Sequence, residues 1–121
     1  MRAHMQIGNN FTGTYVINQH SARSMRAIDN EAALVYLNKV IAESIGSTIL
    51  KTMVHKFTPI GVTAISIISE SHISIHSFPE FSRITVDIFC CNCNIDLTQA
   101  DVCIRKLLDI ESGSFTVVER F

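Results

Sequence analysis

A short stretch near the middle of the chain, in which polar and apolar residues alternate, constrains the fold more than any other feature. In an extended chain Ile73 and Ile75 point to one side, whereas His72, Ser74 and His76 point to the other. The alternation predicts a β-strand with one face in the core. Two histidines and a hydroxyl on the other face exceed what solubility requires, so the strand also predicts a candidate site.

Further segments are rich in β-branched and aromatic residues and predict additional strands. They are residues 11–18, 48–57, 62–68, 84–89 and 115–118. The turn at 58–61, which contains proline and glycine, joins two of them in a hairpin. Residues 1–10 are expected to be a loose end, and residues 19–28 a polar connection without usable periodicity.

Two segments, 31–45 and 97–110, place apolar residues at helical spacing. Asp29 or Asn30 is expected to cap the first helix, and Gly113 to break the second. The order strand, helix, several strands, helix, strand predicts an α+β fold: a two-layer sandwich with two helices on one face of an antiparallel sheet. The other sheet face has no cover, and we expect it to meet a partner subunit or to line the active site.

The length of 121 residues suits one domain, residues 1–121, with a single core. Hydrophobic residues make up 47% and charged residues 17%, which is typical of a globular protein. The net charge of −1 argues against a nucleic-acid partner or an anionic membrane surface. No apolar run approaches the ~20 residues of a membrane helix. Four cysteines without a sign of secretion indicate a reduced, cytoplasmic chain.

The cysteines, together with two histidines, raise the alternative of a zinc site. Structural zinc sites usually pair two C-x2–4-C knuckles, and only Cys90 and Cys93 have that spacing here. Cys103 lies on the apolar stripe of the second expected helix, where a buried role is more common. We therefore predict no metal site.

The run from Glu70 to Glu80 reads Glu-Ser-His-x-x-x-His-x-Phe-Pro-Glu. It resembles the self-cleavage site of the bacterial and archaeal S-adenosylmethionine decarboxylase proenzymes, which make a pyruvoyl group from a serine. The similarity extends over residues 57–61 and 86–91, so the middle third of the chain carries the specific motifs. The resemblance implies an enzyme that releases carbon dioxide from S-adenosylmethionine, a small-molecule substrate, for polyamine (spermidine) synthesis.

The resemblance also implies roles in self-processing. The Ser71 hydroxyl attacks the carbonyl of the preceding residue, and cleavage leaves a β chain of residues 1–70 and an α chain of residues 71–121 that begins with the pyruvoyl cofactor. His76 is the base that removes the Cα proton during elimination. Thr63 stands where the family usually has a serine that assists. Ser71 and His76 have opposite parity in a strand, so these roles require a bulge or a break at the strand start.

Substrate roles follow from the same resemblance. Cys91, twenty residues after the cleavage serine, protonates the substrate Cα after carbon dioxide leaves. Phe57 and Phe78 occupy the positions of two aromatics that sandwich the adenine, and Glu80 that of the carboxylate that binds the ribose hydroxyls. Without the family, core packing for the phenylalanines and a solvated turn for Glu80 are the alternatives. Processed protomers of the family form a homodimer.

The chain departs from the family at several positions. Phe78 stands in place of a usual Trp, residues 90–92 in place of Thr-Cys-Gly, and residues 13–15 in place of a Gly-x-His. Because residues expected around the substrate differ from those usual in the family, two alternatives stay open: a pyruvoyl-dependent arginine or ornithine decarboxylase, or a non-catalytic binding paralogue. Retention of Ser71, His76 and Cys91 together counts against the paralogue.

Overall fold

The structure is a computed structural model that describes residues 7–92 and 94–120. Within these ranges six strands form one antiparallel sheet in the order β2-β3-β4-β5-β1-β6. The strands are β1 (Gly8–Ile17), β2 (Ile49–Lys56), β3 (Val62–Ile68), β4 (Ser71–Phe78), β5 (Arg83–Cys90) and β6 (Ile110–Arg120). The helices are α1 (Ala22–Ala27), α2 (Glu31–Ser44), α3 (Thr98–Leu107) and the short 3-10 helix η1 (Pro79–Phe81).

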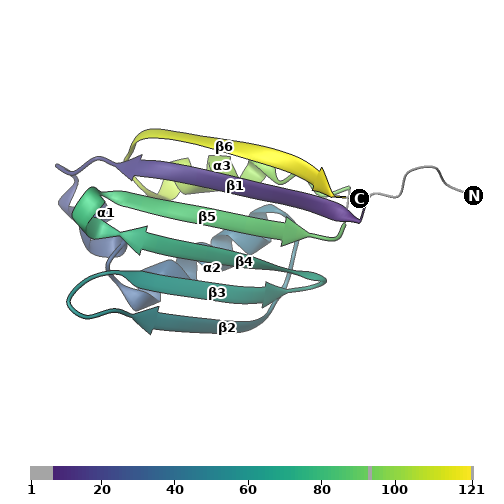
Figure 1. Ribbon diagram of the computed structural model, residues 1–121, viewed down its shortest axis with the longest axis horizontal. Coiled ribbons are helices and arrows are strands. Elements are labelled where there is room, and N and C mark those ends of the chain that lie inside the picture. The colour runs from purple at the N-terminus through teal and green to yellow at the C-terminus, as the bar shows by residue number, and fades with distance from the viewer. Residues whose placement is uncertain (1–6, 93, 121) are drawn as a thin grey trace, which may run out of the picture.

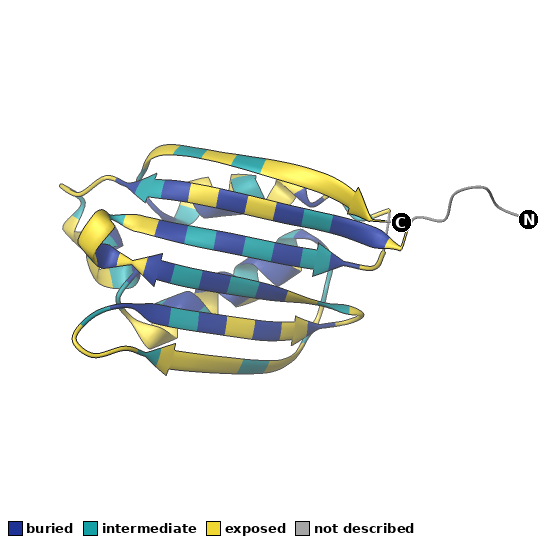
Figure 2. Ribbon diagram, in the orientation of Figure 1, coloured by how far each residue is buried: buried dark blue, intermediate teal, exposed yellow. Residues whose placement is uncertain are grey.

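Helices α2 and α3 cover one face of the sheet and leave the other face open (Figure 1). The core lies between the two layers, and buried residues alternate with less buried ones along the central strands (Figure 2). In β4, Ile73 and Ile75 are fully buried, as the alternation predicts, because they face the helices. The α+β two-layer fold is therefore confirmed. No helix among the described residues is long and apolar enough to cross a membrane.

Strand β4 is regular from its first residue. It pairs with β5 residue for residue, from Ser71 opposite Cys90 to Phe78 opposite Arg83, and with β3 in the same manner. The irregularity lies just before the strand, where Glu70 adopts a φ of 71°. The expected bulge or break within the strand start is therefore absent.

The N-terminal region is more ordered than the sequence suggested. Residues 8–10, expected to belong to a loose end, begin β1 and pair with β5 and β6, whereas residues 1–6 lie outside the described residues. Residues 22–27, expected to be a polar connection, form α1. The Ser21 side chain caps this helix by accepting a hydrogen bond from the Ser24 N–H. A helix of six residues is too short to show an apolar stripe, which explains the difference.

The expectation that Gly113 breaks the second helix is also wrong. Helix α3 ends at Leu107, and Gly113 lies inside β6. A Cβ at Gly113 would lie 2.5 Å from Cδ1 of Tyr15 on the neighbouring strand β1. This glycine is required because the buried tyrosine ring occupies the space of a side chain.

Candidate active site

The first half of the site lies at the turn that leads into β4. The left-handed backbone of Glu70 costs a residue other than glycine about 1–3 kcal/mol, so the turn stores strain next to the Glu70–Ser71 bond. The Ser71 hydroxyl donates a hydrogen bond to the Glu70 carbonyl oxygen and accepts one from the Cys91 N–H at 2.7 Å. The hydroxyl is therefore held beside the carbonyl that it would attack.

Cys91 lies beside Ser71 because β5 and β4 are neighbours. It follows the last residue of β5, Cys90, which pairs with Ser71. Cys91 is exposed, whereas Cys90 is buried in the core. The two predicted residues Ser71 and Cys91 are thus brought together, although they are twenty positions apart in the sequence.

The second half of the site is centred on a pair of residues from β3 and β4. Thr63 lies directly opposite His76, and its Oγ1 is 2.9 Å from Nδ1 of the imidazole. This hydrogen bond fixes the orientation of the ring and leaves Nε2 as the nitrogen that can remove a proton. The threonine thus makes the hydrogen bond expected of a hydroxyl at this position.

A cavity of about 380 Å³ adjoins this pair, and its volume falls within the ~300–1,000 Å³ that is typical of small-molecule sites. Its lining includes all the predicted substrate-binding residues, Phe57, Phe78 and Glu80, together with Thr63 and His76. The phenylalanines are 48% and 41% exposed, so neither ring serves to fill the core. A larger cavity of about 660 Å³ lies between α2 and β2 on the helix side, away from every predicted site residue.

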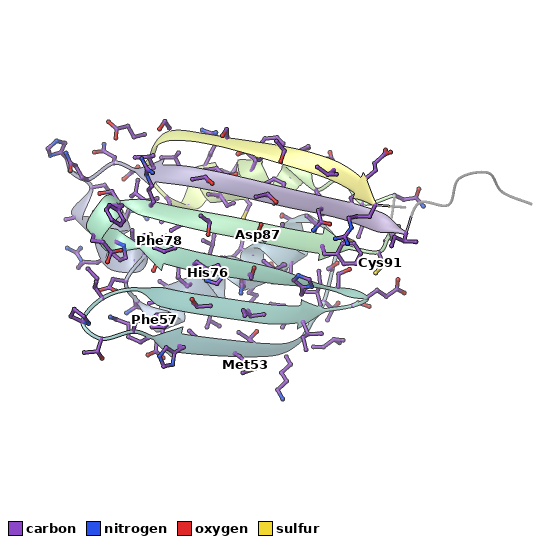
Figure 3. The ribbon with its side chains drawn as sticks, viewed as in Figure 1. Met53, Phe57, His76, Phe78, Asp87 and Cys91 are labelled. Carbon is purple, nitrogen blue, oxygen red and sulfur yellow. The ribbon has the colours of Figure 1, made fainter. Side chains whose placement is uncertain are left out.

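One chain does not bring the two halves together. Ser71 and His76 are five positions apart on a regular strand, which corresponds to about 16 Å along β4, and they point to opposite faces of the sheet. Figure 3 shows Cys91 at one end of the sheet and Phe57 and Phe78 toward the other.

Sequence reasoning missed two residues near the cavity. The His55 ring meets the Phe57 ring edge-on, with centroids 4.6 Å apart. The alternation of residues 48–57 could have found it, since both side chains have the same parity. Asp29 accepts a hydrogen bond from the Gly61 N–H, whereas Asn30 caps α2. No local pattern indicates the Asp29 contact, because it joins residues 32 positions apart.

Within residues 7–92 and 94–120, no three His, Cys, Asp or Glu side chains are grouped so that they could hold a metal ion. Cys93, which belongs to the spacing considered for zinc, lies outside the described residues.

Comparisons with known proteins identify the family of the chain. The sequence model of the S-adenosylmethionine decarboxylase family matches residues 15–121. The S-adenosylmethionine decarboxylase proenzyme of Methanococcus aeolicus is 36% identical over 97 residues, which cover 74% of this chain and 83% of that protein. The proenzyme of Methanococcus maripaludis is 29% identical over 108 residues, with 89% and 88% covered.

Solved structures show the same fold. The adenosylmethionine decarboxylase of Aquifex aeolicus superposes with a TM-score of 0.81 at 23% identity, over 97% of this chain and 92% of that one. A Trypanosoma brucei AdoMetDC monomer superposes with a TM-score of 0.62 at 12% identity, over 90% of this chain and 45% of that longer one.

Proposed function

This chain belongs to the S-adenosylmethionine decarboxylase family, and we propose that it decarboxylates S-adenosylmethionine with a pyruvoyl group formed from its own Ser71. The products are carbon dioxide and decarboxylated S-adenosylmethionine, the aminopropyl donor for polyamine synthesis. The observation that carries the proposal is the Ser71 hydroxyl, held between the Glu70 carbonyl and the Cys91 N–H at a strained turn. A structural serine needs neither the strain nor both contacts.

Self-processing begins at this turn. The Ser71 Oγ adds to the Glu70 carbonyl carbon, the peptide C–N bond breaks, and an ester with a new amino group on residue 71 results. A base then removes the Cα proton of residue 71, and the Cβ–O bond breaks to release the Glu70 carboxylate. The resulting dehydroalanine takes up one water and releases ammonia, which leaves the pyruvoyl group. The products are residues 1–70 and residues 71–121.

We infer that the base, His76, comes from a second copy of the chain. In a two-fold pair whose open sheet faces stack antiparallel, the His76 end of one protomer lies over the Ser71 end of the other. Ser71 is the first residue of β4 and its hydroxyl lies at the end of the sheet beside the Cys91 N–H, so His76 of the second copy approaches it at that end and each pair holds two complete sites. Ile65, Ile67 and Met53 on β3 and β2 support this arrangement, since they are 42%, 50% and 69% exposed on the uncovered face. The separation of the two halves supports the expected homodimer.

The cavity beside His76 then receives the substrate. Phe57 and Phe78 present exposed aromatic faces to the adenine, and Glu80 accepts hydrogen bonds from the ribose hydroxyls. When present, the pyruvoyl carbonyl supplies the electron sink for decarboxylation. Cys91, exposed beside residue 71, returns a proton to the substrate Cα.

The same cavity favours S-adenosylmethionine over arginine or ornithine. Neither amino acid has an adenine to stack or a ribose to hold, and a site specialised for either has no use for two exposed phenylalanines beside a carboxylate.

Two measurements on the purified protein test the proposal. Denaturing mass spectrometry should find two chains divided before residue 71, the C-terminal one starting with pyruvoyl. Processed protein should release carbon dioxide from S-adenosylmethionine and not from arginine or ornithine. A chain that stays intact on long incubation would refute self-processing, and release from an amino acid alone would overturn the substrate.

A further inference from the structure

One residue that lines the substrate cavity, Phe57, lies at the edge of the sheet. Phe57 follows the last residue of β2, an edge strand that pairs only with β3. Phe78, in contrast, ends β4, which is paired on both sides. The sheet alone therefore fixes Phe57 less firmly than Phe78.

A carboxylate from the helix layer compensates for the weaker support that the sheet gives Phe57. Asp29, in the connection between α1 and α2, accepts a hydrogen bond from the Gly61 N–H at 2.8 Å. The same Oδ1 lies 3.1 Å from Nζ of Lys56, which donates a hydrogen bond to the Phe57 carbonyl at 2.9 Å. The Phe57 N–H in turn donates to the Gly61 carbonyl at 2.8 Å. Each backbone group of Phe57 is thus tied through one residue, Gly61 or Lys56, to a single oxygen of Asp29.

Gly61 closes the loop in a conformation that other residues rarely adopt. Its φ is +107°, and a Cβ added at this position would lie 3.9 Å from the Phe57 side chain. The carboxylate therefore holds the turn at Gly61, whose positive φ precedes the first residue of β3. The side chains of Lys56 and Asp29 are each 30% exposed, so water screens this ion pair only in part.

We propose that Asp29 is a positioning residue that holds Phe57 in place for the adenine of the substrate. The inference rests on the proposed function and adds to it a determinant of substrate affinity outside the cavity lining. Asp29 touches no reacting atom in this arrangement. Its loss should weaken substrate binding and leave both self-cleavage and the chemical step intact, because the Thr63–His76 contact belongs to the β3–β4 ladder.

The experiment uses full-length processed enzyme and two variants at the same position. Asp29→Ala should raise KM for S-adenosylmethionine about ten-fold, because a hydrogen bond to a charged group and an ion pair are lost together. Asp29→Asn keeps an oxygen for the Gly61 N–H and should raise KM by less. In both variants kcat should stay within about two-fold of wild type. The Kd of methylthioadenosine, which carries adenine and ribose but no amino acid, should rise in parallel with KM.

Lys56→Met tests the second contact, and a smaller rise of about three-fold in KM is expected from a partly exposed ion pair. The matched control is Arg23→Met, which removes the more exposed Arg23–Asp109 pair on the helix side and should leave KM unchanged. Phenylhydrazine labelling of the pyruvoyl group should be equal in all variants and shows that processing is complete.

Two failures are distinguishable. If wild type neither cleaves nor releases carbon dioxide, the proposed function is wrong. If wild type is active while Asp29→Ala binds methylthioadenosine as tightly as wild type, the positioning role is wrong and the function stands. A loss of kcat or of phenylhydrazine labelling in Asp29→Ala, with KM unchanged, would also overturn the role.

Discussion

Two inactive variants should restore activity to each other when they are combined in one dimer. Ser71→Ala removes the nucleophile but retains the Thr63–His76 pair, and His76→Ala does the reverse. Within one chain the two residues lie about 16 Å apart along β4, which is far beyond the ~3 Å reach of a general base. We therefore expect a site that uses both to take them from two chains.

The expected yield follows from counting sites. Random pairing of equal amounts makes about half of the dimers mixed, and each mixed dimer holds one site with both residues and one site with neither. About a quarter of the wild-type number of complete sites should therefore form. Only the His76→Ala chain can be cleaved in the mixed dimer, because only that chain has Ser71.

Co-expression of the two variants with different tags provides the assay. Mass spectrometry identifies which chain is cleaved, and carbon dioxide release per dimer gives the yield of active sites. Each variant expressed alone is the control, and His76→Ala alone should stop at the ester, which hydroxylamine cleaves. If co-expression produces no more pyruvoyl than the separate variants, the two-chain site is refuted.

Four other outcomes can be measured on single variants. Cys91→Ala should self-cleave normally, as seen by mass spectrometry, but lose about 10²-fold or more in turnover, since a positioned proton donor is missing. Thr63→Val should slow cleavage in a time course and Thr63→Ser should not, because only the hydroxyl binds His76 Nδ1. Gly113→Ala should lower the free energy of unfolding in urea by about 1–3 kcal/mol through overlap with Tyr15. Burial, and then the hydrogen bond to Asp101, raises the pKa of the Tyr15 hydroxyl, so the folded protein keeps this proton where the unfolded chain loses it. Stability should therefore fall as pH rises above about 10, and Tyr15→Phe should reduce that slope in denaturant titrations.

The sequence predicted the parts of the fold that depend on local periodicity. The alternation around Ile73 and Ile75 and the apolar stripes of α2 and α3 repeat at short intervals, so each can be recognised without the rest of the chain. Features that depend on distant partners were missed. Gly113 looks like a helix stop in sequence, and only the Tyr15 ring on the adjacent strand explains it.

The candidate site was likewise predictable where a local motif indicates it and not where it depends on distant partners. The motif from Glu70 to Glu80 identified the residues, and strand parity already placed Ser71 and His76 on opposite faces. A local bulge was one way to reconcile that parity with a shared site, and a second chain is the other. The register of β4 with both neighbours shows no bulge, and no local pattern contains that register.

If the base comes from the second chain, self-cleavage depends on assembly. An isolated chain holds the Ser71 nucleophile at its strained turn and can at most exchange reversibly between the peptide and the ester. The elimination that makes cleavage irreversible needs His76, which arrives only when the open faces pair. The rate of cleavage should therefore rise with protein concentration and level off once all chains are paired, whereas a base within the same chain would make the rate independent of concentration. Pairing before elimination has a chemical consequence. No chain acquires a reactive carbonyl before its partner has placed the cavity of Phe57, Phe78 and Glu80 beside it. The electrophile therefore forms only where its substrate can bind.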